Sequence, residues 1–111
     1  MNRIDLDANP QDFLIWRQGS GTTVEIFDIA VNSHRREGCG RRLINILIDQ
    51  RLPYGTTLVW AITRSTNLIA QSFYEQTGFH VIAVLRRFYS QENGADAIMF
   101  GIDVLTKKEA E

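Results

Sequence analysis

The 111-residue sequence predicts a mixed α/β fold (an α+β mixed sheet) whose elements follow the order β-β-α-β-α-β-β. Three observations predict it. Apolar, β-branched runs indicate strands, two segments with apolar residues at helical spacing each follow a strand, and turns containing glycine separate the elements. A chain of this length is expected to form one compact domain. Both β–α–β units favour a parallel pair of strands at the centre of the sheet.

The N-terminal half is predicted to contain a hairpin followed by a helix. Residues 12–18 and Thr22–Asn32 are expected to be strands, because the turn Gly19-Ser-Gly21 separates two apolar runs. A further strand is possible near residues 3–6. Residues 38–51 are predicted to form a helix, because four apolar residues recur on one of its faces: Leu43, Ile44, Leu47 and Ile48.

The C-terminal half is predicted to hold one buried strand, a second helix and a final hairpin. Pro53-Tyr-Gly55 ends the first helix, and Leu58–Thr63 is apolar enough for a strand buried on both faces. Residues 67–77 are expected to form a helix that Gly78 ends in the left-handed conformation. The remaining elements are two strands, the turn between them and a frayed tail: Phe79–Phe88, Ala95–Val104, Gln91–Gly94 and residues 105–111.

Composition excludes several classes of protein. The net charge of −1 argues against general nucleic-acid binding. No apolar run approaches the roughly 20 residues of a spanning helix, and the N-terminus lacks the apolar region of a signal peptide. The single cysteine excludes an internal disulfide and fits a cytoplasmic protein. His34 and His80 have no partners at metal-ligand spacing, so no metal site is expected.

The segment Asp28–Leu43 joins an apolar strand to a turn rich in glycine and arginine, and this turn opens a helix. The first N–H groups of a helix have no partners within the helix, and its dipole favours an anion there. Gly38 and Gly40 have no side chain that would hold a ligand away from the backbone. Four guanidinium groups surround the same turn and suit phosphate oxygens: Arg35, Arg36, Arg41 and Arg42. The segment therefore predicts a cradle for a pyrophosphate.

Two motifs in order carry a family resemblance. The first is Arg35-x-x-Gly38-x-Gly40, and the second is Asn67-x-x-Ala70-x-x-x-Tyr74-x-x-x-Gly78-Phe79. With them the chain resembles the GNAT superfamily of acetyl-CoA-dependent N-acetyltransferases. It is most similar to the RimI-type branch, which acetylates the N-terminal amine of ribosomal proteins. The resemblance runs from about Glu25 to Val104.

This resemblance implies acetyl-CoA as the co-substrate and names the residues that would bind it. The pantetheine arm would bond main-chain atoms of the strand before the glycine turn, and the pyrophosphate would rest on N–H groups of the turn. At about 100° per residue, Asn67 and Ala70 of the second motif lie on the same helix face as Tyr74. The binding residues so implied are Ile29, Ala30, Val31, Arg35, Arg36, Glu37, Gly38, Cys39, Gly40, Arg41, Asn67, Ala70 and Tyr74.

Tyr74 is implied to be the general acid that protonates the coenzyme A thiolate. A phenol keeps its proton at neutral pH, because the ordinary pKa of tyrosine is about 10. The alternative is that Tyr74 is a half-buried core aromatic beside Phe73. The spacing alone favours this alternative, and the presence of both motifs favours the acid.

The sequence identifies the general base less clearly than the general acid. RimI-type enzymes place a glutamate on the strand before the second helix, where this chain has Ile62. Glu25 is the substitute, and strand alternation predicts that it shares a face with Phe27, Ile29 and Val31, opposite Asp28. The alternatives are that Glu25 is a solvated residue at the end of the strand, and that a water chain carries the proton.

The partners follow from the same resemblance. GNAT domains begin with a strand and two helices that wall the acceptor site, and this segment is expected to be reduced here. The acceptor is expected to be an amine of a protein, peptide or small molecule, and an exposed sheet edge favours a homodimer. The alternative function is a non-catalytic acyl-CoA-binding module that regulates a partner. Cys39 is not expected to be a nucleophile, and Arg86-Arg87 either contact an acidic acceptor or form a solvated strand edge.

Overall fold

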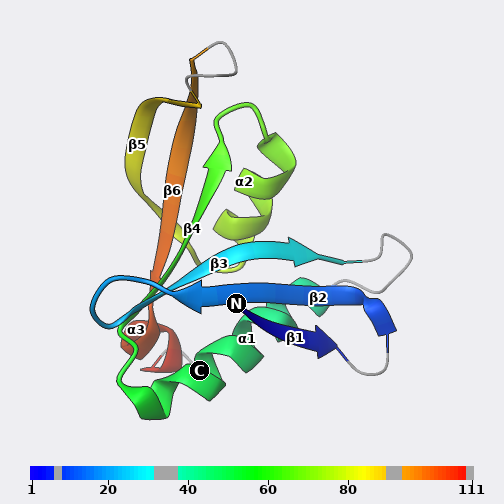
Figure 1. Ribbon diagram of the computed structural model, residues 1–111. Helices are drawn as coiled ribbons and strands as arrows, with labels where there is room; N and C mark the ends of the chain where they lie inside the picture. Colours follow the sequence, from blue (N-terminus) through cyan, green and yellow to red (C-terminus); the bar gives the residue numbers. More distant parts are fainter. Residues whose placement is uncertain (7–8, 32–37, 90–93, 110–111) are drawn as a thin grey trace. The chain divides into compact units, whose positions relative to one another are not determined.

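The computed structural model describes residues 1–6, 9–31, 38–89 and 94–109. It comprises two compact units, Met1–Val59 and Trp60–Glu111. Figure 1 shows the ribbon coloured along the sequence. In the order of hydrogen-bonded neighbours, the first unit holds β1, β2, β3 and the start of β4, and the second holds the rest of β4, then β6 and β5. The predicted mixed α/β class is confirmed.

The first unit begins with three antiparallel strands. They are β1 (Asn2–Leu6), β2 (Asn9–Gln18) and β3 (Thr23–Ala30). The predicted turn joins β2 to β3, because the Gly19 N–H donates to the Thr23 carbonyl at 3.0 Å. The hairpin and the possible first strand are therefore confirmed. The strand β3 ends at Ala30, and the predicted strand end at Asn32 lies outside the described residues.

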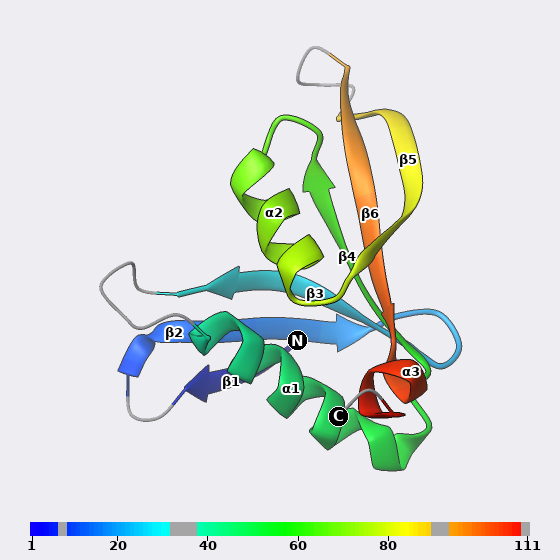
Figure 2. The same ribbon diagram turned by 180° about the vertical axis from the view of Figure 1, so that it is seen from behind.

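Helix α1 (Cys39–Arg51) covers one face of this sheet and continues into the short 3-10 helix η1 (Leu52–Tyr54). Figure 2 shows α1 lying across β1 and β2, with which it is in contact. The apolar face predicted from the sequence is buried, and it packs in a core with side chains from all three strands. The principal members of this core are Ile4, Leu6, Leu14, Trp16, Val24, Ile26, Leu43, Ile44, Leu47 and Ile48.

Strand β4 (Leu58–Arg64) starts beside the start of β3. The Thr57 N–H donates to the Thr22 carbonyl at 2.8 Å, and the two hydroxyl groups lie 2.6 Å apart. Each threonine directly precedes its strand, so both strands run away from this contact in the same direction. The predicted parallel pair is therefore β3 with β4, joined through α1 as a β–α–β unit.

The second unit contains α2 (Leu68–Gln76), β5 (His80–Tyr89), β6 (Ala95–Asp103) and α3 (Val104–Glu109). Strands β5 and β6 form the predicted antiparallel hairpin. The second β–α–β unit does not bring its strands together, because β6 lies between β4 and β5. The Ser65 N–H at the end of β4 accordingly donates to the Asp96 carbonyl of β6 at 2.9 Å.

The end of the chain corrects one expectation. Residues 105–111 are expected to fray, whereas Val104–Glu109 form α3, and residues 110–111 lie outside the described residues. Val104 is fully buried, and the Asp103 carboxylate accepts a hydrogen bond from the Thr106 N–H at 2.9 Å as an N-terminal cap. This N–H holds the pKa of Asp103 below its ordinary value. None of the helices in the described ranges is long and apolar enough to cross a membrane.

Candidate active site

The start of α1 has the geometry that the glycine turn predicts. Gly38 is the N-cap residue and is left-handed, with φ of 96°, a region that L side chains rarely adopt. Its carbonyl accepts the Arg42 N–H at 2.8 Å and so begins the helix. Gly38 offers no side-chain oxygen to the first-turn N–H groups, and the first turn contains no acidic residue. The positive end of α1 is therefore suited to an external anion.

The remaining cradle residues divide into two groups. Arg35, Arg36 and Glu37, expected to contribute to the cradle, lie outside the described residues, and so does His34. Arg41 is exposed in the first turn of α1, whereas Cys39 and Gly40 are buried. The Cys39 side chain is 5% exposed and faces the interior of the first unit.

Strand β3 contains a bulge that the sequence analysis missed. Ile15 of β2 pairs with Asp28, but the next residue, Trp16, pairs with Ile26. Phe27 is therefore an extra residue in β3, and the alternation of side chains changes sides there. A single sequence gives no signal for this insertion, because it becomes visible only in the register with β2.

The bulge corrects the expected neighbours of Glu25. Glu25 pairs with Arg17, and Asp28 and Ala30 lie opposite residues of the same β2 face. Ile29 instead lies opposite Leu14 on the face that α1 covers. Glu25 therefore shares a face with Asp28 and Ala30. Strict alternation had instead predicted that it shares a face with Ile29.

Glu25 is neither solvated nor at the end of its strand. Its exposed fraction is 8%, and its Oε1 lies 2.5 Å from Nε of Arg17 in an ion pair. The guanidinium group of Arg17 also lies over the Phe27 ring, 4.9 Å from the centroid. Of the other β3 residues expected at the site, Ile29 and Ala30 are half-buried, and Val31 directly after the strand is exposed. Ile62, at the RimI-type base position, is half-buried in β4.

Asn67 caps α2 and is not part of the helix. Its φ and ψ are −88° and 81°, and its Oδ1 accepts the Ala70 N–H at 3.0 Å. The strict helical geometry used to place Asn67 on one face with Ala70 and Tyr74 therefore does not apply to it. Asn67 is exposed, Ala70 is half-buried and Tyr74 is buried. The side-chain oxygen of Asn67 has a structural role, and its NH₂ group is the part suited to a ligand carbonyl.

The ring of Tyr74 is enclosed by aromatic side chains, and its exposed fraction is 5%. The ring centroids of Phe73 and Phe79 lie 5.3 and 5.1 Å away in edge-to-face contacts. Phe100 of β6 stacks at 5.6 Å with an interplanar angle of 27°. Tyr74 is thus more buried than the half-buried aromatic of the alternative interpretation, and its role as general acid stays a prediction. Glu25 belongs to the first unit and Tyr74 to the second.

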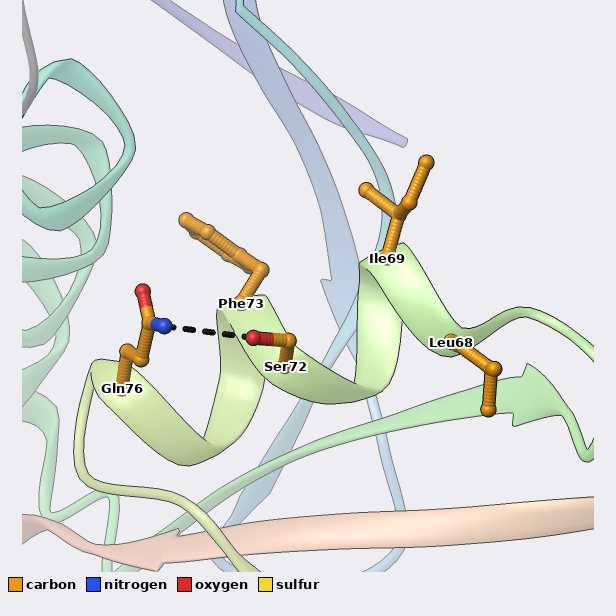
Figure 3. A pocket seen from close by; sticks show the side chains of 5 residues that line it. All are labelled: Leu68, Ile69, Ser72, Phe73 and Gln76. Atoms are coloured by element: carbon orange, nitrogen blue, oxygen red, sulfur yellow. Dashed lines mark hydrogen bonds between the residues drawn. The ribbon is translucent and has the colours of Figure 1, made fainter.

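A pocket on α2 was not anticipated from the sequence. It has a volume of 430 Å³, and its lining residues are Leu68, Ile69, Ser72, Phe73 and Gln76. Figure 3 shows Ile69 and Phe73 projecting on the same side of the helix, and Gln76 donating to the Ser72 hydroxyl, with Nε2 and Oγ 3.2 Å apart. Leu68 and Ile69 are 71% and 86% exposed. Two adjacent apolar residues at a helix start were the available signal, because such residues cannot both face the core.

The other candidates from the sequence, Arg86, Arg87 and His80, are exposed residues of β5. Arg86 and Arg87 are exposed at the end of β5, where Asp96 contacts both. Its Oδ2 lies 3.8 Å from Nη1 of Arg86, and its Oδ1 accepts the Arg87 N–H at 2.7 Å. This agrees with a solvated strand edge. His80 is exposed, and the described part of the chain contains no cluster of three or more side chains that could hold a metal ion.

Comparison with known proteins relates most of this sequence to one family. Residues 6–79 match the model of the acetyltransferase (GNAT) family. The [ribosomal protein bS18]-alanine N-acetyltransferase of Escherichia coli K12 is 33% identical over 81 residues, which cover 71% of this chain and 55% of the relative. The corresponding enzyme of Haemophilus ducreyi is 30% identical over 71 residues, which cover 63% of this chain and 49% of the relative. The chain thus spans about half the length of the curated relatives it matches.

Solved structures show the same fold. The crystal structure of the Escherichia coli ribosomal-protein-S18-alanine N-acetyltransferase superposes with a TM-score of 0.72 at 29% identity, over 93% of this chain and 68% of that one. A Bacillus subtilis acetyltransferase in complex with CoA superposes with a TM-score of 0.73 at 22% identity, over 88% and 72%. The second likeness shows the fold alone.

Proposed function

The chain belongs to the GNAT acetyltransferase family, and on this premise we propose that it transfers the acetyl group of acetyl-CoA to a primary amine. The observation that carries the proposal is the left-handed Gly38 at the start of α1, within the matched region and without a carboxylate in the first turn. A Cβ added to Gly38 would meet no atom of the described residues within 4 Å, so among these residues the space beside this backbone is open to a ligand. The turn therefore fits a pyrophosphate.

The proposed acceptor is the N-terminal amine of a protein or peptide. Its support is the activity of the relatives, which are N-acetyltransferases for an alanine of ribosomal protein bS18. The proposed place of action is the cytoplasm, where ribosomes are made.

The proposed reaction is a direct attack. The amine nitrogen forms a bond to the thioester carbonyl carbon, the carbon–sulfur bond breaks, and the thiolate takes a proton. Tyr74 supplies this proton as general acid. Glu25 accepts the amine proton as general base, directly or through a water molecule. The buried position of Glu25 supports this role, because a carboxylate held in place by Arg17 keeps one orientation.

The experiment that tests the proposal is calorimetric titration with acetyl-CoA and with free coenzyme A, followed by thiol release against a panel of N-terminal peptides and small amines. Binding together with release for one of the acceptors supports the transferase. Binding without release for any acceptor contradicts it and favours the regulatory acyl-CoA-binding module. Absence of binding makes the glycine turn a structural connection only.

Glu25→Gln is expected to remove the increase of kcat/KM with pH, because the amide cannot accept the amine proton. The measurement is the pH–rate profile of the variant beside the wild type. Asp28→Asn is the matched control, since Asp28 is an exposed carboxylate on the same face of β3. If the pH–rate profile of Glu25→Gln follows that of the wild type, water accepts the amine proton and Glu25 is not the base.

A homodimer is the proposed state of assembly. Its support is the exposed apolar surface of Phe27 and Val31 in the first unit and of Val81 and Val84 in the second. Sedimentation at increasing protein concentration is expected to show a dimer. A monomer at all concentrations would contradict the proposal.

A further inference from the structure

The carbonyl oxygen of Tyr74 receives three hydrogen-bond donors at the end of α2. The Thr77 N–H lies 3.2 Å away, the Thr77 hydroxyl 3.1 Å and the Phe79 N–H 2.9 Å. The last carbonyl groups of a helix are often satisfied by one donor or by water. Three donors on one carbonyl therefore fix the backbone from which the Tyr74 side chain projects.

The Thr77 hydroxyl makes a connection that its backbone alone would not make. It has one hydrogen, shared between the carbonyl of Phe73 at 3.0 Å and that of Tyr74 at 3.1 Å. Thr77 is buried, so water does not readily replace this hydroxyl. The contact therefore ties two consecutive residues of α2, one of which lines the α2 pocket.

Gly78 and Phe79, which follow Thr77, are also restrained by contacts with their neighbours. Gly78 is left-handed with φ of 99°, and a Cβ there would meet Cδ1 of Ile102 at 3.3 Å. Phe79 follows and contacts the Tyr74 ring with its own ring while its N–H donates to the Tyr74 carbonyl. The ring and the backbone of Tyr74 are thus restrained by the same short segment.

From these contacts we propose that Thr77 is a positioning residue for the Tyr74 phenol. The proposal rests on the proposed function, in which Tyr74 is the general acid. Thr77 acts through Tyr74, because its hydroxyl bonds the backbone of α2. Its loss displaces the phenol, and small displacements of a reacting group cost much rate.

A double-mutant cycle of Thr77→Val and Tyr74→Phe tests this proposal. Valine keeps the branched shape of threonine and replaces its hydroxyl with a methyl group. In the wild-type background, Thr77→Val is expected to lower kcat about tenfold with an unchanged KM for acetyl-CoA. In the Tyr74→Phe background it is expected to change kcat by less than about twofold, because the phenol is already absent. Thr77→Ser keeps the hydroxyl and is expected to keep most of the activity.

Thr56→Val is the control, since Thr56 is also a buried threonine but lies before β4 in the first unit. It is expected to leave kcat unchanged. Equal losses from Thr77→Val in both backgrounds would show a merely structural role and overturn the proposal, as would full activity of Thr77→Val. If Tyr74→Phe itself has no effect, the acid assignment fails, and positioning fails with it.

A second variant decides the matter if Thr77→Val does not fold. Thr77→Ala also removes the hydroxyl, and it puts no methyl group in its place beside the two carbonyl groups. In the same cycle it measures whether the loss of the hydroxyl acts through the phenol. A loss confined to the background that contains Tyr74 supports positioning by Thr77, and an equal loss in both backgrounds overturns it.

Discussion

Tyr74→Phe is expected to lower kcat by about 100-fold or more, with little change in the KM for acetyl-CoA. The phenol hydroxyl is the only group removed, so the thiolate would have to leave without its proton donor. The enclosing rings of Phe73, Phe79 and Phe100 remain, and phenylalanine fills the same volume among them. The fold is therefore expected to stay intact. Steady-state kinetics and thermal unfolding on one preparation provide both measurements.

The matched control for this variant is Tyr54→Phe. Tyr54 is an exposed tyrosine of the 3-10 helix η1, with the guanidinium group of Arg51 4.4 Å from its ring centroid. Loss of its hydroxyl is expected to leave kcat unchanged. Equal turnover of Tyr74→Phe and wild type would instead make Tyr74 a core residue only, and the proton would reach the thiolate by another route.

Gly38→Ala is expected to weaken coenzyme A binding about tenfold or more. The added methyl group lies beside N–H groups on which the pyrophosphate is proposed to rest, so the ligand cannot approach the backbone as closely. In the part of the chain that the structure describes, the methyl group meets no atom within 4 Å, so no clash with that part is expected. The left-handed backbone alone costs about 1–2 kcal/mol of unfolding free energy. Calorimetric titration and denaturant unfolding measure the two effects separately.

Gly55→Ala separates the loss of affinity from the loss of stability. Gly55 is also left-handed, with φ of 80°, and its added methyl group likewise meets no described atom within 4 Å. It ends η1, away from the start of α1. Both variants are expected to lose similar unfolding free energy, and only Gly38→Ala is expected to lose affinity. A similar loss of affinity in both would trace the effect to general destabilisation.

Local signals in the sequence were sufficient for much of this fold. The apolar face of α1 and the left-handed glycines at 38 and 78 follow from spacing and steric freedom, which act within a few residues. The parallel pair followed from the handedness of β–α–β connections. Each of the two glycine-containing motifs lies where one of the helices begins or ends.

Features set by contacts distant in sequence were missed. The bulge at Phe27 depends on the register with β2, and it changed the neighbours of Glu25. The insertion of β6 between β4 and β5 depends on how a hairpin pairs with the rest of a sheet. Helix α3 was missed because its charged sequence has no apolar period, and its stability comes from the Asp103 cap and the buried Val104.

The position of Cys39 gives the protein an internal reporter. The chain has one cysteine, and its thiol is buried in the first turn of α1. A thiol reagent can reach it only when that turn opens, so the rate of alkylation follows the local opening equilibrium of the helix start. A ligand bound at the same turn favours the closed form and slows the labelling. The native chain can therefore report occupancy of its own glycine turn without an added chromophore or an engineered cysteine.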